Sequence, residues 1–254
     1  SWFSMLFSAG MGIGLLYFGV SEPIQHFLKP PMPQASTADL AIQALDFTFL
    51  HYGLHAWSIY CIVGLSLAYF AFNRGLPFSL RSIFYPIIGD KIKGIYGNIV
   101  DIIAVVATLI DSGVNTQITV ILVITMIATV SVVTGLKKGV RFLSRLNMIL
   151  ALIFLTFVLF LTDTIGVMGI FIESTGMYFQ RFIEIGTWSS SLVDSTWQNN
   201  WTIFYYSWWV AWAPFVGMFI ARISKGRTFK EFVLGVLFVP TLMTFFWISV
   251  FGGT

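Results

Sequence analysis

Long apolar stretches recur along the chain, and shorter polar connections separate them. A stretch of about 20 apolar residues can cross a membrane as a helix, whereas lipid cannot satisfy the backbone of an open strand. A membrane barrel would instead show short segments of alternating hydrophobicity. The pattern therefore predicts an all-α integral membrane protein with seven transmembrane helices, at residues 2–20, 53–72, 94–112, 117–135, 146–162, 198–221 and 232–250.

Basic residues are concentrated in alternate connections. The connections 74–93, 136–145 and 222–231 each hold four Lys or Arg, and the others together hold two, Lys29 and Arg181. Cytoplasmic loops of membrane proteins carry such an excess, so these three connections are expected inside the cell. The net charge of +3 comes from these loops and does not indicate a nucleic-acid partner.

The two ends of the chain fall at predicted helices. The charge pattern places residue 1 in the cytoplasm and residue 254 outside, in a multi-pass protein of the cell (inner) membrane. Because Ser1 already lies in a predicted helix and no initiator Met precedes it, we expect an internal piece of a longer protein. The single cysteine, Cys61, excludes a disulfide within one chain.

The first predicted span carries Gly10, Gly12 and Gly14 near its centre. Glycine weakens a helix and lets other atoms approach the backbone closely. These glycines indicate either close packing between helices or an unwound segment whose carbonyls line a site. Two glycines four residues apart suffice for packing, so three alternating glycines favour the unwound segment.

The polar connections also contain helix signals. A helix over 37–50, beginning after Ser36, is too short and too polar to span, so we expect it on the external surface. One or two further surface helices are expected within 163–197. Thr228 and Glu231 have the spacing of a capping box at the start of the seventh span.

The sixth span contains the stretch WTIFYYSWWVAWAPF at 201–215. Trp201 lies at its outer end, where interfacial tryptophan is usual, but Trp208, Trp209 and Trp212 lie at mid-membrane. Pro214 is expected to kink the helix and to free a backbone carbonyl. Indole faces attract methylated ammonium groups, so the stretch predicts a cation site or, alternatively, aromatic helix packing. One helix face carries Tyr205, Trp208, Trp209 and Trp212.

A second aromatic set lies near the external end of the second span and comprises Tyr52, Trp57 and Tyr60. Trp57 and Tyr60 are one turn apart, and an interfacial belt is the alternative to a ligand site. His51 and His55 have a metal-compatible spacing. No carboxylate or cysteine lies near them in the sequence, so we expect no metal site there.

Asp101 is a carboxylate inside the third span. An intramembrane carboxylate indicates function, yet a position near the cytoplasmic end also suits an inner gate or an ion pair with a loop lysine. Thr108 follows two turns further out on the same face and is a candidate hydroxyl ligand for an ion.

Four motifs together resemble the betaine/carnitine/choline transporter family (BCCT). They are AGMGIG at 9–14, EP at 22–23, HYGLHAWSIY at 51–60 and NWTIFYYSWWVAWAPFVGMFIARISKGRT at 200–228, and the last is close to the family signature. The likeness covers nearly the whole chain. It implies a transporter and not an enzyme, without an organic or metal cofactor besides sodium.

The resemblance implies a LeuT-like core of two inverted repeats within a protein of twelve helices. Residues 1–254 then form one partial transmembrane transporter domain that holds the third to ninth helices. Residues 1–165 are the first repeat, and residues 196–254 start the second. Members of the family are often homotrimers, so a homotrimer is expected as well.

The resemblance also implies binding roles. An aromatic box for the quaternary ammonium falls on Tyr52, Trp57, Tyr60 and Trp209, with Tyr52 where sodium-coupled members usually carry Trp. Trp208 and Trp212 line the path and help to place the substrate carboxylate. The glycine segment contributes carbonyls near Met11, which adds Gly10, Gly12 and Gly14 to the expected substrate region.

Sodium is the coupling ion that the resemblance implies. Carbonyls of Ser8 and Met11 belong to one sodium site, and Thr108 and Phe215 contribute to a second. After VVATL the chain is shorter than the family pattern over residues 109–116, which weakens the expectation of the second site.

The leading hypothesis is a sodium-coupled symporter for an osmoprotective quaternary ammonium or sulfonium solute such as glycine betaine. A sodium-independent exchanger of carnitine or betaine and a proton-coupled choline transporter are the alternatives. Proton-coupled choline transporters resembling this family often carry Asp near Gly14, so glycine at this position favours a zwitterion. A retinal protein is excluded because the last span has no lysine.

Overall fold

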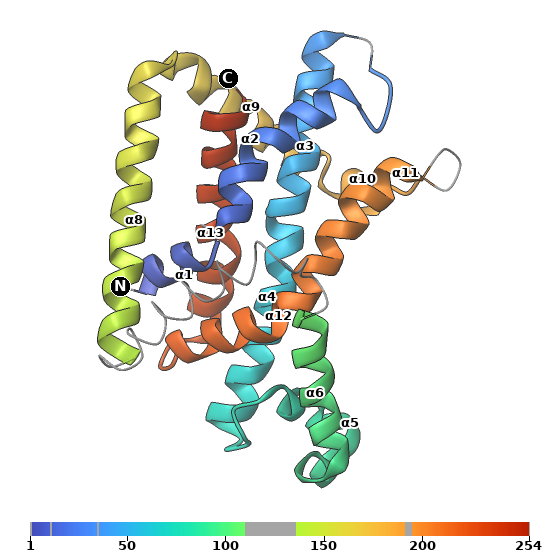
Figure 1. Ribbon diagram of the computed structural model, residues 1–254, viewed down its shortest axis with the longest axis vertical. Helices are drawn as coiled ribbons and strands as arrows, with labels where there is room; N and C mark the ends of the chain where they lie inside the picture. The colour runs from blue at the N-terminus through green and yellow to red at the C-terminus, as the bar shows by residue number, and fades with distance from the viewer. Residues whose placement is uncertain (1, 11, 35, 110–135, 191–194, 254) are drawn as a thin grey trace.

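The computed structural model describes residues 2–10, 12–34, 36–109, 136–190 and 195–253 (Figure 1). All regular structure in these ranges is helical. The first half comprises α1 (Trp2–Gly10), α2 (Ile13–Leu28), α3 (Thr37–Tyr52), α4 (Leu54–Ala68), the π-helix η1 (Tyr69–Asn73), η2 (Leu80–Phe84), α5 (Tyr85–Ile88), η3 (Gly89–Lys93) and α6 (Ile95–Leu109). The second half comprises α8 (Leu136–Leu161), α9 (Thr164–Gln180), α10 (Phe182–Thr187), α11 (Thr196–Gln198), the π-helix η4 (Asn199–Ile203), α12 (Phe204–Ile223) and α13 (Phe229–Gly252).

Four helical segments are long and apolar enough to cross a membrane: Thr37–Asn73, Arg141–Leu161, Thr196–Ile223 and Phe229–Gly252. They coincide with the predicted second, fifth, sixth and seventh spans, which confirms a multi-pass membrane protein. A shorter apolar helix, Ile95–Ala104, lies where the third span was predicted. The predicted fourth span, 117–135, lies outside the described residues.

The first predicted span is two helices. α1 ends at Gly10 and α2 begins at Ile13, and the two helices point in different directions (Figure 1). Between them Gly12 has an extended backbone, with φ −109° and ψ 177°. The predicted interruption at the alternating glycines is therefore present.

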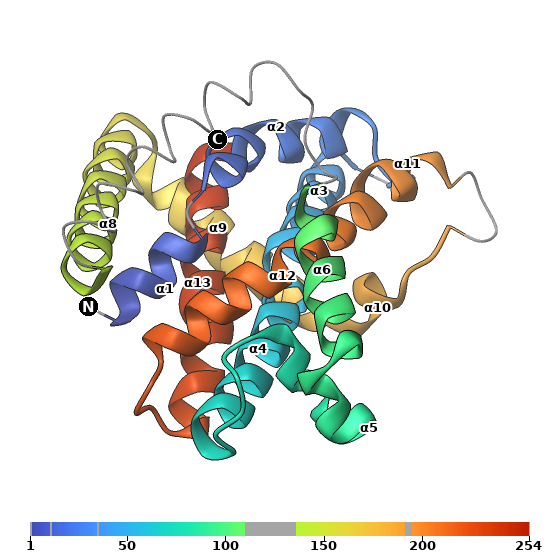
Figure 2. The ribbon, with the colours of Figure 1, turned by 60° about the horizontal axis from the view of Figure 1, so that its bottom comes forward.

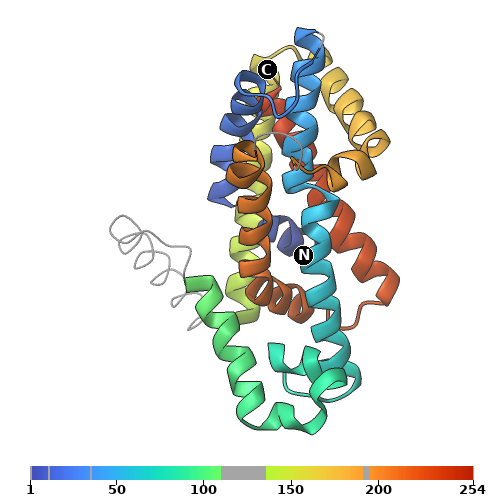
Figure 3. The ribbon, with the colours of Figure 1, turned by 90° about the vertical axis from the view of Figure 1, so that its right-hand side faces the viewer.

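The helix predicted on the external surface is exposed only at its start and is buried from Gln43 onward. Every residue of α3 from Gln43 to Tyr52 is buried, because α3 packs against α2, α9 and α13. After Gly53 the chain continues into α4, so α3 and α4 form one long rod (Figure 3). The prediction was wrong because polar residues of α3, including Asp46 and His51, meet partners on other helices and not solvent.

Glycines allow the central helices to approach closely. A Cβ atom at Gly64 in α4 would lie 3.2 Å from the Gly217 carbonyl oxygen in α12. At the α3–α4 junction a Cβ atom at Gly53 would lie 2.8 Å from the Phe245 ring of α13. Small residues serve this purpose widely in membrane helices. α13 thereby packs among α1, α2, α4 and α9 in the middle of the molecule (Figure 2).

The connections alternate between two ends of the molecule. In Figure 1 the segments that hold basic residues, from η1 to η3 and at the starts of α8 and α13, lie toward the lower end. The α2–α3 and α8–α9 connections lie toward the upper end. This arrangement agrees with the alternation of charge in the sequence, and the assignment of the lower end to the cytoplasm stays a prediction.

Two local predictions are confirmed. Thr228 caps α13, its side chain accepting from the Glu231 backbone N–H and that of Glu231 accepting from Thr228 N–H. α9 and α10 occupy the connection where one or two surface helices were expected.

α12 contains Pro214 and changes direction along its length (Figures 1 and 3). A proline in a helix interior removes a backbone hydrogen bond and accounts for such a bend.

Candidate functional site

A cavity of about 530 Å³ lies beside the interruption between α1 and α2. It is lined by parts of α2, α3, α4, α12 and α13. The lining residues are Gly12, Gly14, Leu15, Tyr17, Phe18, Tyr52, Trp57, Tyr60, Trp208, Trp209, Trp212, Val216 and Thr244. None of these described residues is charged, so any charge on a ligand would face aromatic rings, hydroxyl groups and backbone.

The cavity brings together eight of the ten residues expected at a substrate site. All six predicted aromatic side chains and two of the glycines line it: Tyr52, Trp57, Tyr60, Trp208, Trp209, Trp212, Gly12 and Gly14. Gly10 is the last residue of α1, but its burial and contacts lie outside what the structure describes. Met11 lies outside the described residues.

Three rings form a compact group on one side of the cavity. The Trp209 ring centroid lies 4.6 Å from that of Tyr60 and 5.5 Å from that of Trp57. Trp57 and Tyr60 meet edge to face at 5.6 Å. Trp57 is 1% exposed, Tyr60 7% and Trp209 9%. Such burial rules out an interfacial belt for Trp57 and Tyr60, because belt residues face the headgroups.

Tyr52 lines the cavity and is hydrogen-bonded to Tyr205, which does not line it. The Tyr52 hydroxyl donates to the Tyr205 hydroxyl at 3.1 Å, and the Tyr205 side chain is fully buried. Tyr205 does not line the cavity, although its spacing in the sequence places it on the same helix face as Trp208 and Trp209. It stacks on the His51 ring, with centroids 4.8 Å apart and planes 10° apart.

Sequence reasoning missed five lining residues, of which Leu15 and Val216 are aliphatic. Tyr17 and Phe18 belong to α2 and Thr244 belongs to α13. Thr244 is buried and adds a hydroxyl group to the cavity wall. The signal for it was a polar residue in a long apolar span, but Thr241 and Ser249 give the same signal nearby.

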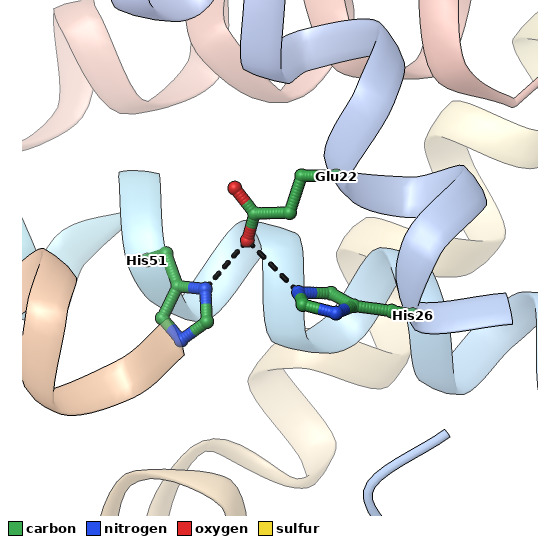
Figure 4. A group of neighbouring side chains, drawn as sticks. All are labelled: Glu22, His26 and His51. Atoms are coloured by element: carbon green, nitrogen blue, oxygen red, sulfur yellow. Dashed lines mark hydrogen bonds and ion pairs between the residues drawn. The ribbon is translucent and has the colours of Figure 1, made fainter. Parts of the chain in front are cut away.

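A buried polar cluster is formed by Glu22 and His26 of α2 and His51 of α3 (Figure 4). Glu22 Oε1 lies 3.0 Å from His26 Nε2 and 2.5 Å from His51 Nδ1. His51 Nε2 lies 3.0 Å from the Thr202 hydroxyl in η4. Sequence reasoning missed this cluster because the carboxylate and His51 are 29 positions apart.

The cluster has hydrogen-bond geometry and not ligand geometry. Two ligands of one tetrahedral zinc ion lie roughly 3.3 Å apart, given metal–ligand distances of about 2.0–2.1 Å. The contact of 2.5 Å between Glu22 and His51 is shorter than that and suits a shared hydrogen. His55 is not part of the cluster, since its Nδ1 pairs with the Tyr178 hydroxyl at 2.9 Å.

The residues expected at sodium sites are only partly described. The side chains of Ser8 and Thr108 and all of Met11 lie outside the described features. Phe215 lies in α12, and its side chain is exposed. The expected ligand sets therefore stay predictions.

Asp101, in the first half of α6, forms an ion pair with Arg81. Its Oδ2 accepts from Arg81 Nε at 2.7 Å, and its Oδ1 accepts from the Arg81 backbone N–H at 3.0 Å. Of the roles that the sequence allowed, the ion pair with a connection is the one present. The partner is an arginine, not a lysine.

Comparison with known proteins agrees with this architecture. The model of the BCCT family, described as betaine/carnitine/choline family transporter, matches residues 1–114 and 109–254. The two matches meet where the sequence departs from the family pattern. Alignments with relatives run over as many as 281 positions, more than the 254 residues of the chain, so these relatives carry residues that the chain lacks.

Three relatives illustrate the likeness. The chain is 46% identical to a glycine betaine/proline/choline/ectoine transporter of Vibrio parahaemolyticus, with 100% of the chain and 50% of that protein aligned. It is 44% identical to the osmo-independent choline transporter BetT1 of Acinetobacter baylyi, over 100% and 53%. It is 42% identical to the glycine betaine transporter OpuD of Bacillus subtilis, over 99% and 54%.

The chain spans about half the length of these relatives. Both matches to the family model together extend over its whole length, and Trp208, Trp209 and Trp212 of the family signature line the cavity. The chain therefore belongs to the betaine/carnitine/choline transporter family, a family of membrane transporters and not of enzymes.

Proposed function

We propose that the protein containing this chain transports a quaternary ammonium or sulfonium solute, such as glycine betaine, across the cell membrane. The observation that carries the proposal is the uncharged, aromatic cavity beside the interruption between α1 and α2. The printed names of the relatives, which include glycine betaine and choline transporters, support the same substrate class.

The ring group of Trp57, Tyr60 and Trp209 suits a methylated ammonium. Such a cation has no N–H group to donate, and aromatic ring faces can attract it without a charged side chain. Each cation–π contact contributes about 0.5–2 kcal/mol, which makes several rings necessary for useful affinity. The buried ring group provides them without a charged side chain.

The start of α2 suits the carboxylate of a zwitterion. Gly12 precedes the helix and has no side chain to cap it, so backbone N–H groups of the first turn remain available. The positive end of the helix dipole favours an anion there. Gly12 and Gly14 line the same cavity as the rings, so the two charges of a betaine would meet opposite sides of one site.

Transport by alternating access and coupling to sodium complete the proposal. The LeuT-like inverted repeats, the sodium ligands Ser8, Met11, Thr108 and Phe215 and the homotrimer come from the family resemblance alone. A sodium-independent exchanger of carnitine or betaine and a proton-coupled choline transporter remain the competing functions. They differ from sodium symport in the ion that drives uptake, so ion dependence separates them.

The test is uptake of labelled glycine betaine by the full-length protein in proteoliposomes, with and without an inward sodium gradient. We expect sodium-dependent uptake that is lost in Trp209→Leu. Trp188→Leu is the matched control, because Trp188 packs on Phe47 and Trp197 and does not line the cavity.

The other outcomes are equally informative. Uptake that is indifferent to sodium but lost in Trp209→Leu would retain the binding site and replace the coupling mechanism. Absence of betaine, choline and carnitine uptake under every gradient would refute the substrate class. Equal losses in Trp209→Leu and Trp188→Leu would show a folding effect and remove the support for the ring group.

A further inference from the structure

The Glu22–His26–His51 cluster needs a positive charge or a proton to compensate the buried Glu22 carboxylate. All three side chains are fully buried. Among the described residues, the other titratable groups around Glu22 are Tyr52 and Tyr205, which are neutral hydroxyl groups. An ionised carboxylate beside two neutral imidazoles would leave one uncompensated negative charge in the interior, which is strongly unfavourable.

The hydrogen-bond partners restrict where a compensating proton can sit. Glu22 Oε2 and His26 Nδ1 have no partner in the described structure. A proton on either atom would be a buried donor without an acceptor, whereas an unprotonated atom there is only an unused acceptor. Buried donors without partners are rarer than under-used acceptors in proteins. The proton therefore belongs elsewhere in the cluster.

His51 can use a proton on each of its nitrogens. Its Nε2 lies 3.0 Å from the Thr202 hydroxyl oxygen, which can accept. Its Nδ1 lies 2.5 Å from Glu22 Oε1, where one proton can sit on either atom. In both positions the sum over the cluster is neutral and every donor of His51 has an acceptor.

We propose that Glu22 and His51 form a site for one proton, held between Glu22 Oε1 and His51 Nδ1, while His51 Nε2–H donates to Thr202. The hydrogen bonds of this site connect three separate segments, α2, α3 and η4. Figure 4 shows the Glu22 carboxylate facing the His51 ring. His26 Nε2–H donates to the same carboxylate oxygen and keeps His26 neutral.

The rings around His51 favour the proton. Tyr205 stacks on the imidazole with planes 10° apart, and the Trp197 ring lies 6.2 Å away at 29°. Aromatic faces at these distances attract a cationic ring. The arrangement thus stabilises positive charge on His51.

The site is separate from the proposed substrate cavity but adjoins it. His51 precedes Tyr52 in α3 and stacks on Tyr205, whose hydroxyl accepts from Tyr52. Glu22 and His51 do not line the cavity, so their effect on it would pass through these two tyrosines. The proton site does not depend on which solute is transported.

The test is nitrogen NMR of the full-length protein in lipid bilayers with ¹⁵N-labelled histidine. His51 is assigned as the signal lost in His51→Gln, and His55→Gln is the matched control that loses a different signal. We expect His51 Nε2 to be protonated at neutral and mildly alkaline pH. Thr202→Val should shift this Nε2 signal because it removes the acceptor hydroxyl, and His55→Gln should leave it unchanged.

A His51 that is protonated only on Nδ1, with Nε2 accepting from Thr202, would overturn the proposal, because the cluster would then lack the shared proton. Should His51→Gln fail to fold, the shift in Thr202→Val provides the assignment. Failure of betaine uptake would not affect this measurement, so the two proposals are tested independently.

Discussion

The edge of the Trp208 indole lies 2.7 Å from the position that a Cβ atom at Gly14 would occupy. Real Cβ atoms essentially never come so close to another heavy atom, so glycine is needed for Trp208 to lie where it does. Gly14 belongs to α2 and Trp208 to α12, two of the helices that line the cavity. The close approach brings an indole ring over the start of α2.

Gly14→Ala is expected to displace Trp208 and to weaken substrate binding. A side chain forced about 30° from its preferred rotamer costs about 0.5–1.5 kcal/mol, which corresponds to roughly a two- to twelve-fold rise in KM for uptake. Gly169→Ala in α9 is the control, because no atom lies within 4 Å of the added Cβ. An unchanged KM in Gly14→Ala would contradict the close packing.

The ring group should recognise charge and not only shape. We expect Trp209→Leu to weaken competition by a trimethylammonium compound by about 0.5–2 kcal/mol, or roughly two- to thirty-fold. Competition by a neutral analogue with carbon in place of the nitrogen should change less, since it loses only apolar contact. Competition assays on binding to the full-length protein measure both. Equal losses for the two compounds would indicate a hydrophobic pocket.

Asp101 should contribute to stability and not to ion coupling. Its pair with Arg81 is partly exposed, so Asp101→Asn is expected to cost about 0–1 kcal/mol. Arg81→Gln should have a similar effect, and the double variant should be no worse than either. Thermal unfolding measures this. If Asp101→Asn abolished uptake with an unchanged Tm, the carboxylate would have a direct role in transport.

Arg181 and Asp46 should respond unequally to substitution. Arg181 Nη1 donates to Asp46 Oδ2 at 3.0 Å, and the Asp46 side chain is fully buried while that of Arg181 is 20% exposed. Arg181→Gln leaves a buried charge without its partner, a loss of about 3–5 kcal/mol at most. Asp46→Asn leaves Arg181 with Glu184 and should cost less. Thermal unfolding that ranks the two variants in the opposite order would refute this explanation.

Glu184 should make stability depend on pH in the acid range. Hydrogen bonds from Arg181 lower the pKa of Glu184, which lies in the short helix α10 outside the candidate spans. A lowered folded-state pKa gives stability that is present above the unfolded pKa and is lost as pH falls through the folded value. Glu184→Gln should flatten this part of the Tm–pH curve. Parallel curves for the two proteins would show that the pair contributes nothing.

Local patterns were sufficient for much of this protein. The length of the apolar stretches and the alternating glycines predicted the spans and the interruption after Gly10. Helical spacing placed Trp57 with Tyr60, and the family signature indicated which aromatic residues to combine. These features depend on neighbours within one or two turns, so they can be read along the chain.

Contacts between helices were decided by the tertiary structure. The short, polar sequence of α3 predicted a helix on the external surface. In the fold, α2, α9 and α13 pack against α3 and bury it from Gln43 to Tyr52. Along the chain His51 and His55 have a metal-compatible spacing, but the fold turns His51 toward Glu22 and His55 toward Tyr178. Hydropathy and periodicity indicate which face of a helix is apolar or polar. They do not indicate which other helix packs against that face. That choice depends on how the whole bundle packs, and glycines such as Gly64 and Gly217 allow the approach that sets it.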